Sequence, residues 1–264
     1  MDIEQMENVR KALIVVPCGG NPDKFDPRYD KEAHWRSKHP TRTYEILNLM
    51  YNDFEPDPNT YDHIIRDVKG HKWQMIAKAF TRIQRFDFAK YDYIGCIDDD
   101  QITDVWNLNM GLELARRFDF RLWQLSMADQ SDVFYECLKQ QPGTVFTETN
   151  FIECGVPVFR NDVFKKILKA LTYPEWKYEQ AWGLDKAYTD IAQSHAHVIH
   201  CASIYHPKRE AYYNNDRSGA MNELHDFMSH TYPKMCRDIF NRETLMVDEQ
   251  RVYNTYRMVK HDVK

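Results

Sequence analysis

A short apolar run followed directly by three aspartates is the feature that most constrains the fold of this chain. The run, residues 91–97, is rich in β-branched and aromatic residues and predicts a buried strand. Asp98, Asp99 and Asp100 come next. These acids then stand at the carboxyl end of a strand, where open α/β sheets bind their ligands. The pattern therefore predicts an α/β fold with a site at this strand end.

The acidic triplet has two interpretations. In an extended chain Asp98 and Asp100 would point to the same side, about 7 Å apart. Two carboxylates on one side suit a divalent cation such as Mg²⁺ or Mn²⁺, and that cation would relieve the repulsion among adjacent negative charges. Alternatively, the triplet is a solvated turn in which an aspartate caps the next helix.

Composition limits the class of protein. The 264 residues suffice for one large α/β domain with a helical extension. A net charge of −5 argues against non-specific nucleic-acid binding as the main activity. The longest apolar runs have about five residues, whereas a membrane-spanning helix needs about 20. The charged amino terminus has no signal-peptide pattern, and the six scattered cysteines form no CxxC pair. We therefore expect a cytoplasmic protein with reduced thiols and no membrane span.

Strand and helix signals alternate along the chain, as in a doubly wound sheet. Residues 44–51 fit either a strand or a short helix, and the last fifty residues look helical and polar. The clearest predicted strands are residues 12–18, 91–97, 120–127, 151–160 and 196–206, and the clearest predicted helices are residues 70–86, 105–118, 161–172 and 182–193.

Two further acids are candidates for chemistry. Asp185, in AWGLDKAY, follows a glycine at a helix start, where a carboxylate could act as a general base toward an acceptor hydroxyl. Otherwise it is an ordinary first-turn acid that favours the helix dipole. Glu153 interrupts the apolar stretch FIECGVPVF. It either points to water or is held in a site for a polar ligand.

Basic residues offer sites for phosphate. His206 follows an apolar strand and precedes Pro207, Lys208 and Arg209. An imidazole beside two cations suits a metal shell and a diphosphate, although the same residues also fit a solvated basic turn. Lys72, at the start of a predicted helix, could pair with phosphate, although most surface lysines have no specific partner.

Taken in order, these segments resemble GT-A-type glycosyltransferases. They are most similar to a little-characterised GT-A-like family related to glucosyltransferases that act on hydroxymethylated pyrimidines in DNA. The shared pattern includes a Lys-Trp helix, a Tyr-Asp-Tyr strand ending in three aspartates, an Ile-Glu-x-x-x-Pro-x-Phe segment, a Trp-Gly-Leu-Asp turn and a late histidine. The resemblance implies a Rossmann-type, mostly parallel sheet flanked by helices. We expect a catalytic domain over residues 1–210 and a helical extension of the same domain over residues 211–264.

The resemblance also implies an activity, namely the metal-dependent transfer of a sugar from a nucleotide sugar, most simply a UDP-sugar, to an acceptor hydroxyl with inversion. Asp98 and Asp100 would bind Mn²⁺ or Mg²⁺, and His206 would complete the metal shell. Asp185 would be the base, and Glu153 would hold sugar or acceptor hydroxyls. The expected contacts to the donor come from Val16, Pro17, Cys18, Lys72, Asp98 and Lys208.

The sequence does not decide the chemical identity of the acceptor. Residues 23–42 and 208–217 mix basic and aromatic side chains that could grip DNA and stack a flipped base. Acids within the first segment dilute its charge, so the acceptor is either a hydroxymethylated pyrimidine in DNA or a glycan or small molecule. Two other classes remain, a haloacid-dehalogenase-type phosphatase, which also places D-x-D after a strand, and a non-catalytic nucleotide-sugar-binding module.

Overall fold

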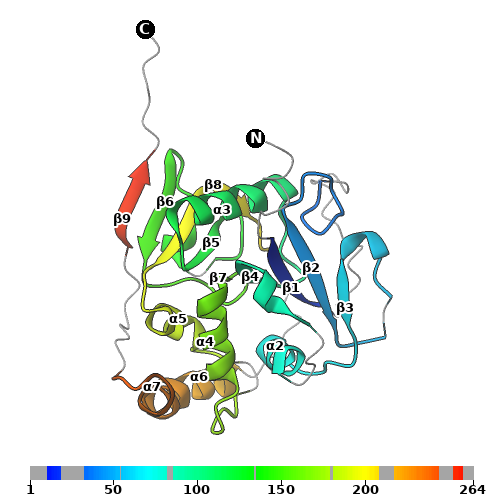
Figure 1. Ribbon diagram of the computed structural model, residues 1–264. Helices are drawn as coiled ribbons and strands as arrows, with labels where there is room; N and C mark the ends of the chain where they lie inside the picture. The colour runs from blue at the N-terminus through cyan, green and yellow to red at the C-terminus, as the bar shows by residue number, and fades with distance from the viewer. Residues whose placement is uncertain are drawn as a thin grey trace.

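The computed structural model describes residues 11–18, 33–53, 55–81, 86–133, 135–178, 181–207, 217–243 and 252–257. Within this part, a nine-stranded mixed sheet runs in the order β3-β2-β1-β4-β7-β5-β8-β6-β9 (Figure 1). The strands are β1 (Ala12–Cys18), β2 (Tyr44–Met50), β3 (His63–Ile65), β4 (Tyr93–Cys96), β5 (Leu122–Met127), β6 (Thr144–Thr149), β7 (Val158–Arg160), β8 (Ala196–Ile204) and β9 (Val252–Arg257).

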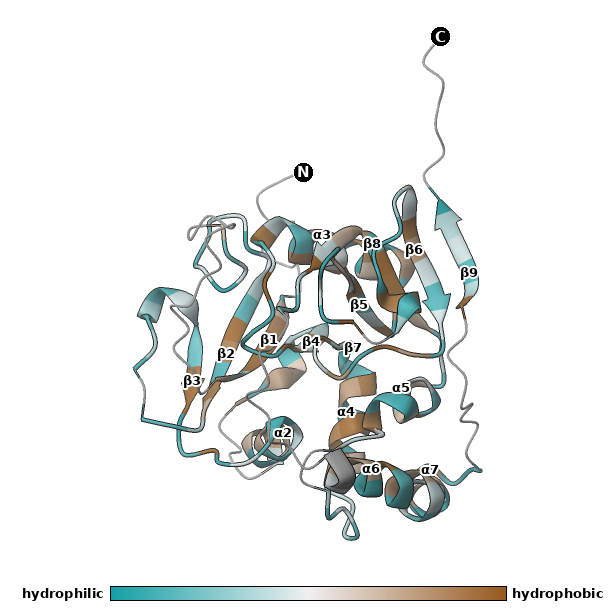
Figure 2. Cartoon of the chain, turned by 180° about the vertical axis from the view of Figure 1, so that it is seen from behind, coloured by the Kyte–Doolittle hydropathy of each residue, from teal (hydrophilic) through white to brown (hydrophobic). Residues whose placement is uncertain are grey.

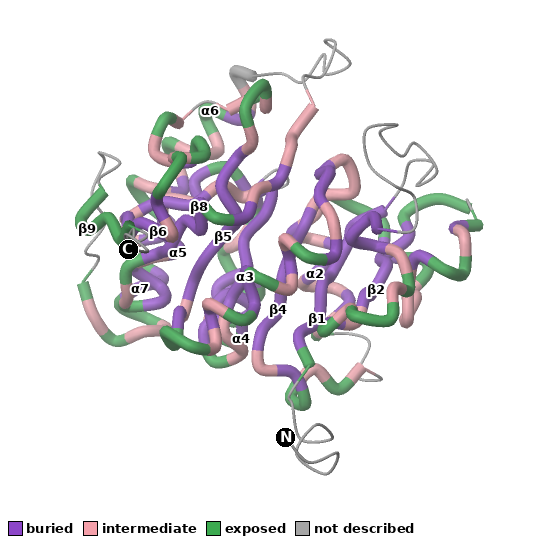
Figure 3. The backbone as a smooth tube through the Cα atoms, turned by 90° about the horizontal axis from the view of Figure 1, so that it is seen from above, coloured by how far each residue is buried: buried purple, intermediate pink, exposed green. Residues whose placement is uncertain are grey.

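The central strands are buried on both faces, which explains their continuous apolar runs. Strands β1, β2, β3 and β4 pair in parallel. β7 is antiparallel to both β4 and β5, and β5 pairs in parallel with β8. Figure 2 shows the apolar colouring concentrated on these inner strands, and Figure 3 shows the same strands as the most buried part of the tube. Because β4, β5 and β8 run in the same direction, their carboxyl ends lie at the same end of the strands, on one side of the sheet.

Helices cover both faces of the sheet. α3 (Val105–Phe118) lies on one face, while α2 (Lys72–Thr81), α4 (Asn161–Leu171) and α5 (Leu184–Ala192) lie on the other (Figure 1). α6 (Arg217–Asp226), a π-helical turn (Phe227–Thr231) and α7 (Tyr232–Phe240) pack below α4 and α5. Short 3₁₀ turns occupy Pro58–Thr60, Phe88–Lys90 and Glu136–Leu138. The predicted α/β class is therefore confirmed.

Some of the helices and strands expected from the sequence are confirmed, and one expected strand is wrong. Of residues 44–51, Tyr44–Met50 form a strand, and residues 105–118 form the predicted helix. The strand expected over residues 151–160 is wrong for most of its length, because only Val158–Arg160 pairs in the sheet. Pro157 has no N–H to give to a ladder, and residues 151–157 instead make an irregular segment that crosses to the carboxyl end of β4.

The tail is only partly helical. α6 and α7 agree with the expectation for residues 211–264, but β9 (Val252–Arg257) is a strand that pairs antiparallel with β6 at the sheet edge. Four of its six residues are β-branched or tyrosine (Val252, Tyr253, Thr255 and Tyr256), a composition that favours a strand over the expected helix. The tail therefore returns to the main sheet.

Two further expectations concern the chain as a whole. Within the described residues, no helix is both long enough and apolar enough to cross a bilayer. All six cysteines are free thiols: three are buried, two are partly buried and one is exposed. A framework of disulfides therefore plays no part in holding the described fold together.

Candidate active site

The three aspartates form a tight turn just beyond β4. The strand ends at Cys96, and the Gln101 N–H donates to the Asp98 carbonyl at 3.2 Å. The extended geometry expected for Asp98 and Asp100 is therefore wrong, because the chain turns at once. The turn directs the two side chains to different partners on neighbouring elements.

Asp98 lies against the first residue of α2. Its Oδ1 is 2.9 Å from Lys72 Nζ, and its side chain keeps 31% of its surface exposed. Lys72 also donates to the carbonyls of Cys154 (2.6 Å) and Gly155 (3.2 Å). Partial burial raises the pKa of Asp98, and the Lys72 ammonium opposes that rise. Lys72 thus joins the acidic turn to the segment that carries Glu153.

Asp100 faces the end of β8. Ile102 and Tyr205 exchange two backbone hydrogen bonds of 2.9 and 2.7 Å, which hold the residues after β4 beside those after β8. This pairing places Asp100 Oδ2 3.6 Å from His206 Nε2. Burial lowers the pKa of His206, but the Asp100 carboxylate outweighs that effect, so the pKa is raised overall. Asp100 and His206 are therefore brought together as predicted for a shared site.

Glu153 is a largely buried acid within this group. Its backbone N–H donates to Gln124 Oε1 at 2.7 Å, which fixes the segment over β5. Its Oε2 is buried and has no hydrogen-bond partner among the described residues. Burial raises its pKa to about 7, with Asp98 and Asp185 adding to the rise and His206 and Lys72 opposing it. Of the two sequence interpretations, the structure supports a carboxyl held inside a polar site.

Asp185 lies in the first turn of α5 at the same site. The preceding Gly183 has φ of 95°, a left-handed conformation that glycine adopts without strain. The carboxylate accepts from the Lys186 N–H at 2.9 Å. Burial still raises its pKa to about 6, because backbone N–H groups offset only part of the desolvation. This carboxylate is thus more basic than an ordinary aspartate and largely ionised at neutral pH.

The tail holds α5 at both ends. A Cβ on Gly183 would lie 2.8 Å from Leu224 Cδ1 and 3.0 Å from Phe227 Cδ1, so these side chains pack directly on the turn before Asp185. At the other end, the Tyr232 hydroxyl donates to Asp190 Oδ2 at 2.8 Å. Arg242 forms an ion pair with the same carboxylate. The tail therefore takes part in fixing the helix that carries Asp185.

The expected donor contacts at the end of β1 lie close by. Val16, Pro17 and Cys18 are buried in the strand, and β1 is the neighbour of β4. Burial raises the pKa of the Cys18 thiol, the charge of Arg36 opposes that rise, and the charge of Asp99 adds to it. Arg36, also buried, approaches Cys18 Sγ at 3.9 Å. Lys208, and most of the basic segments proposed for DNA, lie outside the described residues.

The side chains present fit an open divalent-cation site. Asp98 and Asp100 offer hard oxygen donors, and His206 offers a nitrogen donor. Gly155 lies directly beside them, because a Cβ there would be in ordinary van der Waals contact with Asp98 Oδ2 at 3.5 Å and Gln101 Nε2 at 3.4 Å. Within the described part of the chain, no three His, Cys, Asp or Glu side chains form a ready-made metal cage. An ion such as Mg²⁺ that takes one or two carboxylates and completes its shell with phosphate and water suits this arrangement.

Some site residues were not found from the sequence. Gln101 and Gly155 line the acidic turn, and Gln124 positions Glu153. The Asp132 carbonyl lies 3.3 Å from His206 Nδ1. Gly155, two residues after Glu153, is a usable signal of close approach. The others act through backbone atoms or a buried amide, for which the sequence carries no pattern.

Comparisons with known proteins place the fold. No family model matches the sequence, and no curated protein matches it. Solved structures do match: that of S. aureus TarS 1-349 has a TM-score of 0.52 at 10% identity, covering 87% of this chain and 75% of that chain. The same protein in complex with UDP gives a TM-score of 0.51 at 9% identity, with the same two coverages.

At such low identity the likeness shows the fold alone. The mixed sheet flanked by helices matches GT-A-like neighbours, so the fold class expected from the sequence is confirmed.

Proposed function

We propose that this protein is a glycosyltransferase that moves a sugar from a nucleotide sugar, most simply a UDP-sugar, to an acceptor hydroxyl. The observation that carries the proposal is the convergence of Asp98, Asp100, Glu153, Asp185 and His206 at one edge of a GT-A-like sheet. The neighbour crystallised in complex with UDP adds support for a uridine nucleotide as donor.

The acidic turn would hold the donor diphosphate through a divalent cation. Asp98, Asp100 and His206 would bind Mn²⁺ or Mg²⁺, which supplies Lewis-acid stabilisation to the leaving diphosphate. Lys72 would share Asp98 with the ion and keep the turn fixed to the 154–155 segment. Lys208 remains a predicted additional cation for the diphosphate, and Val16, Pro17 and Cys18 would border the nucleoside.

Asp185 would act as the general base. As the acceptor oxygen attacks the anomeric carbon, Asp185 would take the acceptor proton, and the bond between that carbon and the diphosphate would break with its electrons leaving on the diphosphate. A pKa of about 6 makes this carboxylate ionised yet basic at neutral pH. Attack from the face opposite the leaving group gives inversion. Glu153 would hold sugar or acceptor hydroxyls, using its unsatisfied oxygen.

The test is a screen of nucleotide sugars for hydrolysis and transfer, with Mn²⁺, with Mg²⁺ and with chelator. The acceptor panel includes DNA with hydroxymethylated pyrimidines, glycans and small alcohols. Asp185→Asn should retain donor binding while transfer falls by a factor of about 100 or more. Binding that survives Asp185→Asn with no turnover in the wild type would instead identify a non-catalytic nucleotide-sugar-binding module.

A further inference from the structure

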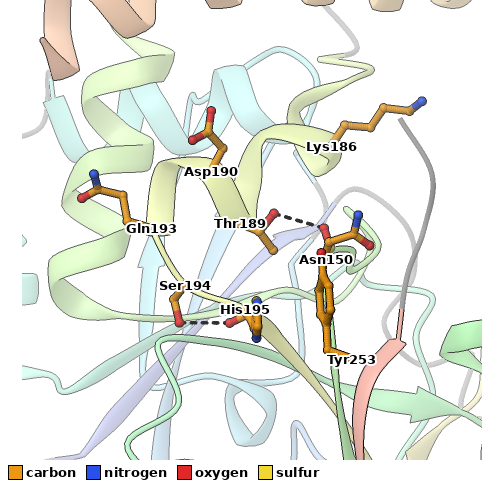
Figure 4. A pocket seen from close by; sticks show the side chains of 8 residues that line it. All are labelled: Asn150, Lys186, Thr189, Asp190, Gln193, Ser194, His195 and Tyr253. Carbon is orange, nitrogen blue, oxygen red and sulfur yellow. Dashed lines mark hydrogen bonds between the residues drawn. The ribbon is translucent and has the colours of Figure 1, made fainter. Parts of the chain in front are cut away.

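A pocket beside α5 lies outside the groups assigned so far. It has a volume of about 480 Å³, within the range of small-molecule sites. Figure 4 shows side chains of α5, of the residues after it and of β9 around the cavity. The lining residues are Asn150, Lys186, Thr189, Asp190, Gln193, Ser194, His195 and Tyr253.

The walls of this pocket continue from the candidate active site. Thr189 lies four residues after Asp185, so the two share one side of α5 a single helical turn apart. Thr189 Oγ1 donates to the Asn150 carbonyl at 3.1 Å (Figure 4). Asn150 begins the segment that reaches Glu153. The segment that bears Glu153 and the helix that bears Asp185 therefore also line the pocket.

One wall is aromatic. The rings of His195 and Tyr253 stack with centroids 4.3 Å apart and planes 11° apart. Tyr253 belongs to β9, so this wall exists because the tail returns to the sheet edge. A flat aromatic wall favours the C–H face of a sugar ring, since aromatic faces carry partial negative charge.

The remaining walls of the pocket are polar and carry little net charge. The Asp190 carboxylate is committed to Tyr232 and Arg242. Gln193 Oε1 accepts from Lys166 at 3.3 Å, and the Ser194 hydroxyl donates to the His195 carbonyl at 3.1 Å. Lys186 provides an ammonium at the end nearest Asp185. Amides, hydroxyls and one cation around an aromatic face match the hydroxyl pattern of carbohydrate.

We infer that this pocket holds the sugar units of a glycan acceptor that extend beyond the hydroxyl being glycosylated. The inference rests on the proposed function and narrows its acceptor to the carbohydrate class. A glycan with its reactive hydroxyl at Asp185 would run along α5, with a sugar ring on the His195–Tyr253 wall.

The experiment measures ligand binding and turnover separately on the full chain. Saturation-transfer NMR tests maltotriose, cellotriose and triacetylchitotriose in the presence of UDP and Mn²⁺, and donor hydrolysis is followed in parallel. We expect at least one trisaccharide to bind and to raise donor consumption. Tyr253→Ala should weaken that binding at least tenfold.

Matched variants separate the pocket from folding of the tail. Tyr256→Ala removes the other tyrosine of β9, which stacks on Phe146 at 4.3 Å and lines no part of the pocket. It should change trisaccharide binding less than twofold. Lys186→Met tests the opposite wall on α5 and should also weaken binding, even if Tyr253→Ala fails to fold.

The outcomes distinguish the two proposals. Donor hydrolysis without binding of any trisaccharide, or equal binding by wild type, Tyr253→Ala and Lys186→Met, would overturn the pocket assignment alone. Transfer to hydroxymethylated DNA but to no glycan would overturn it as well. A wild-type protein that neither binds nor hydrolyses any nucleotide-sugar donor would instead overturn the proposed function.

Discussion

β4 separates two acidic groups with opposite surroundings. Near its amino end, Asp92, Asp119 and Asp162 each pair with an arginine, at 2.7 Å for Arg116–Asp92, 2.6 Å for Arg160–Asp119 and 3.0 Å for Arg121–Asp162. Beyond its carboxyl end, Lys72 pairs with Asp98 and His206 with Asp100, and both cations act on Glu153. The cation that acts on Asp185, the fourth acid of this group, is Lys186.

The two groups also differ in their proton affinities. Hydrogen bonds and ion pairs with Arg160 and Arg121 lower the pKa of Asp162 to about 2. Burial raises the pKa of Glu153 to about 7 and that of Asp185 to about 6. Acids that form ion pairs with arginine stabilise the fold. Acids that outnumber the nearby cations keep a negative potential, which can attract a cationic or hydrogen-bonding ligand. The predictions below test this contrast.

The largest effect should come from the acidic turn. Asp100→Ala removes a carboxylate expected to hold the cation, so turnover should fall at least ~100-fold while the melting temperature stays near that of the wild type. Asp119→Ala, in the arginine-paired group, is the matched control and should keep turnover within about twofold. Kinetic assays and thermal melts measure both. An Asp100→Ala enzyme with unchanged activity would remove the basis for the metal role.

The second effect concerns the pH profile. A base must be deprotonated to act, so kcat/KM should fall about tenfold for each pH unit below the Asp185 pKa of about 6. The residual activity of Asp185→Asn should lack that limb. A profile that stays flat from pH 7 to pH 4.5 in the wild type would contradict the assignment of Asp185 as base.

The third prediction compares stability against pH for the two groups, with metal removed by chelator. The folded-state pKa of Glu153 is raised, so the stability it contributes below about pH 4.5 is lost as pH rises through about 7. Glu153→Gln should therefore gain stability over the wild type between pH 5 and pH 8. A constant difference in melting temperature across this range would count against the prediction.

Asp162 should behave in the opposite sense. Its folded-state pKa is lowered, so the stability it contributes is present above about pH 3.8 and is lost as pH falls through about 2. Asp162→Asn should be less stable than the wild type at pH 7, and the gap should narrow below pH 4. Urea unfolding at several pH values gives the comparison.

The smallest effect should come from a single ion pair at the amino end of β4. Arg116 and Asp92 form a bidentate pair, with side chains 22% and 18% exposed. Arg116→Met should lower the free energy of unfolding by about 1–2 kcal/mol, with turnover within about twofold. A tenfold loss of turnover without loss of stability would show that the two groups are not independent.

The fold was largely accessible from the sequence because buried parallel strands carry continuous apolar runs. The strands at residues 12–18 and 91–97 and the helix at residues 105–118 follow from such patterns. The apolar residues of segment 151–157 wrongly predict a strand, because they serve an irregular crossing. The sequence pattern does not predict β6, and the expected helical tail is wrong at β9 despite its aromatic and β-branched residues.

Part of the candidate site could be predicted from the sequence, for a chemical reason. Acids at strand and helix ends, such as Asp98, Asp100 and Asp185, carry a visible signal because charge rarely stands beside apolar runs without a role. Pairing across distant segments has no such signal. The Ile102–Tyr205 bridge that joins Asp100 to His206, and the Gln124 amide that fixes Glu153, depend on tertiary geometry alone.

The close contact between Gly183 and the Leu224 and Phe227 side chains bears on how the protein can be shortened. The catalytic domain expected from the sequence ends at residue 210, which invites an expression clone that stops there. Such a clone would keep Asp98, Asp100 and His206, yet it would free both ends of α5. The later helices are therefore not an appendage, because they pack with the Trp-Gly-Leu-Asp turn as one structural unit.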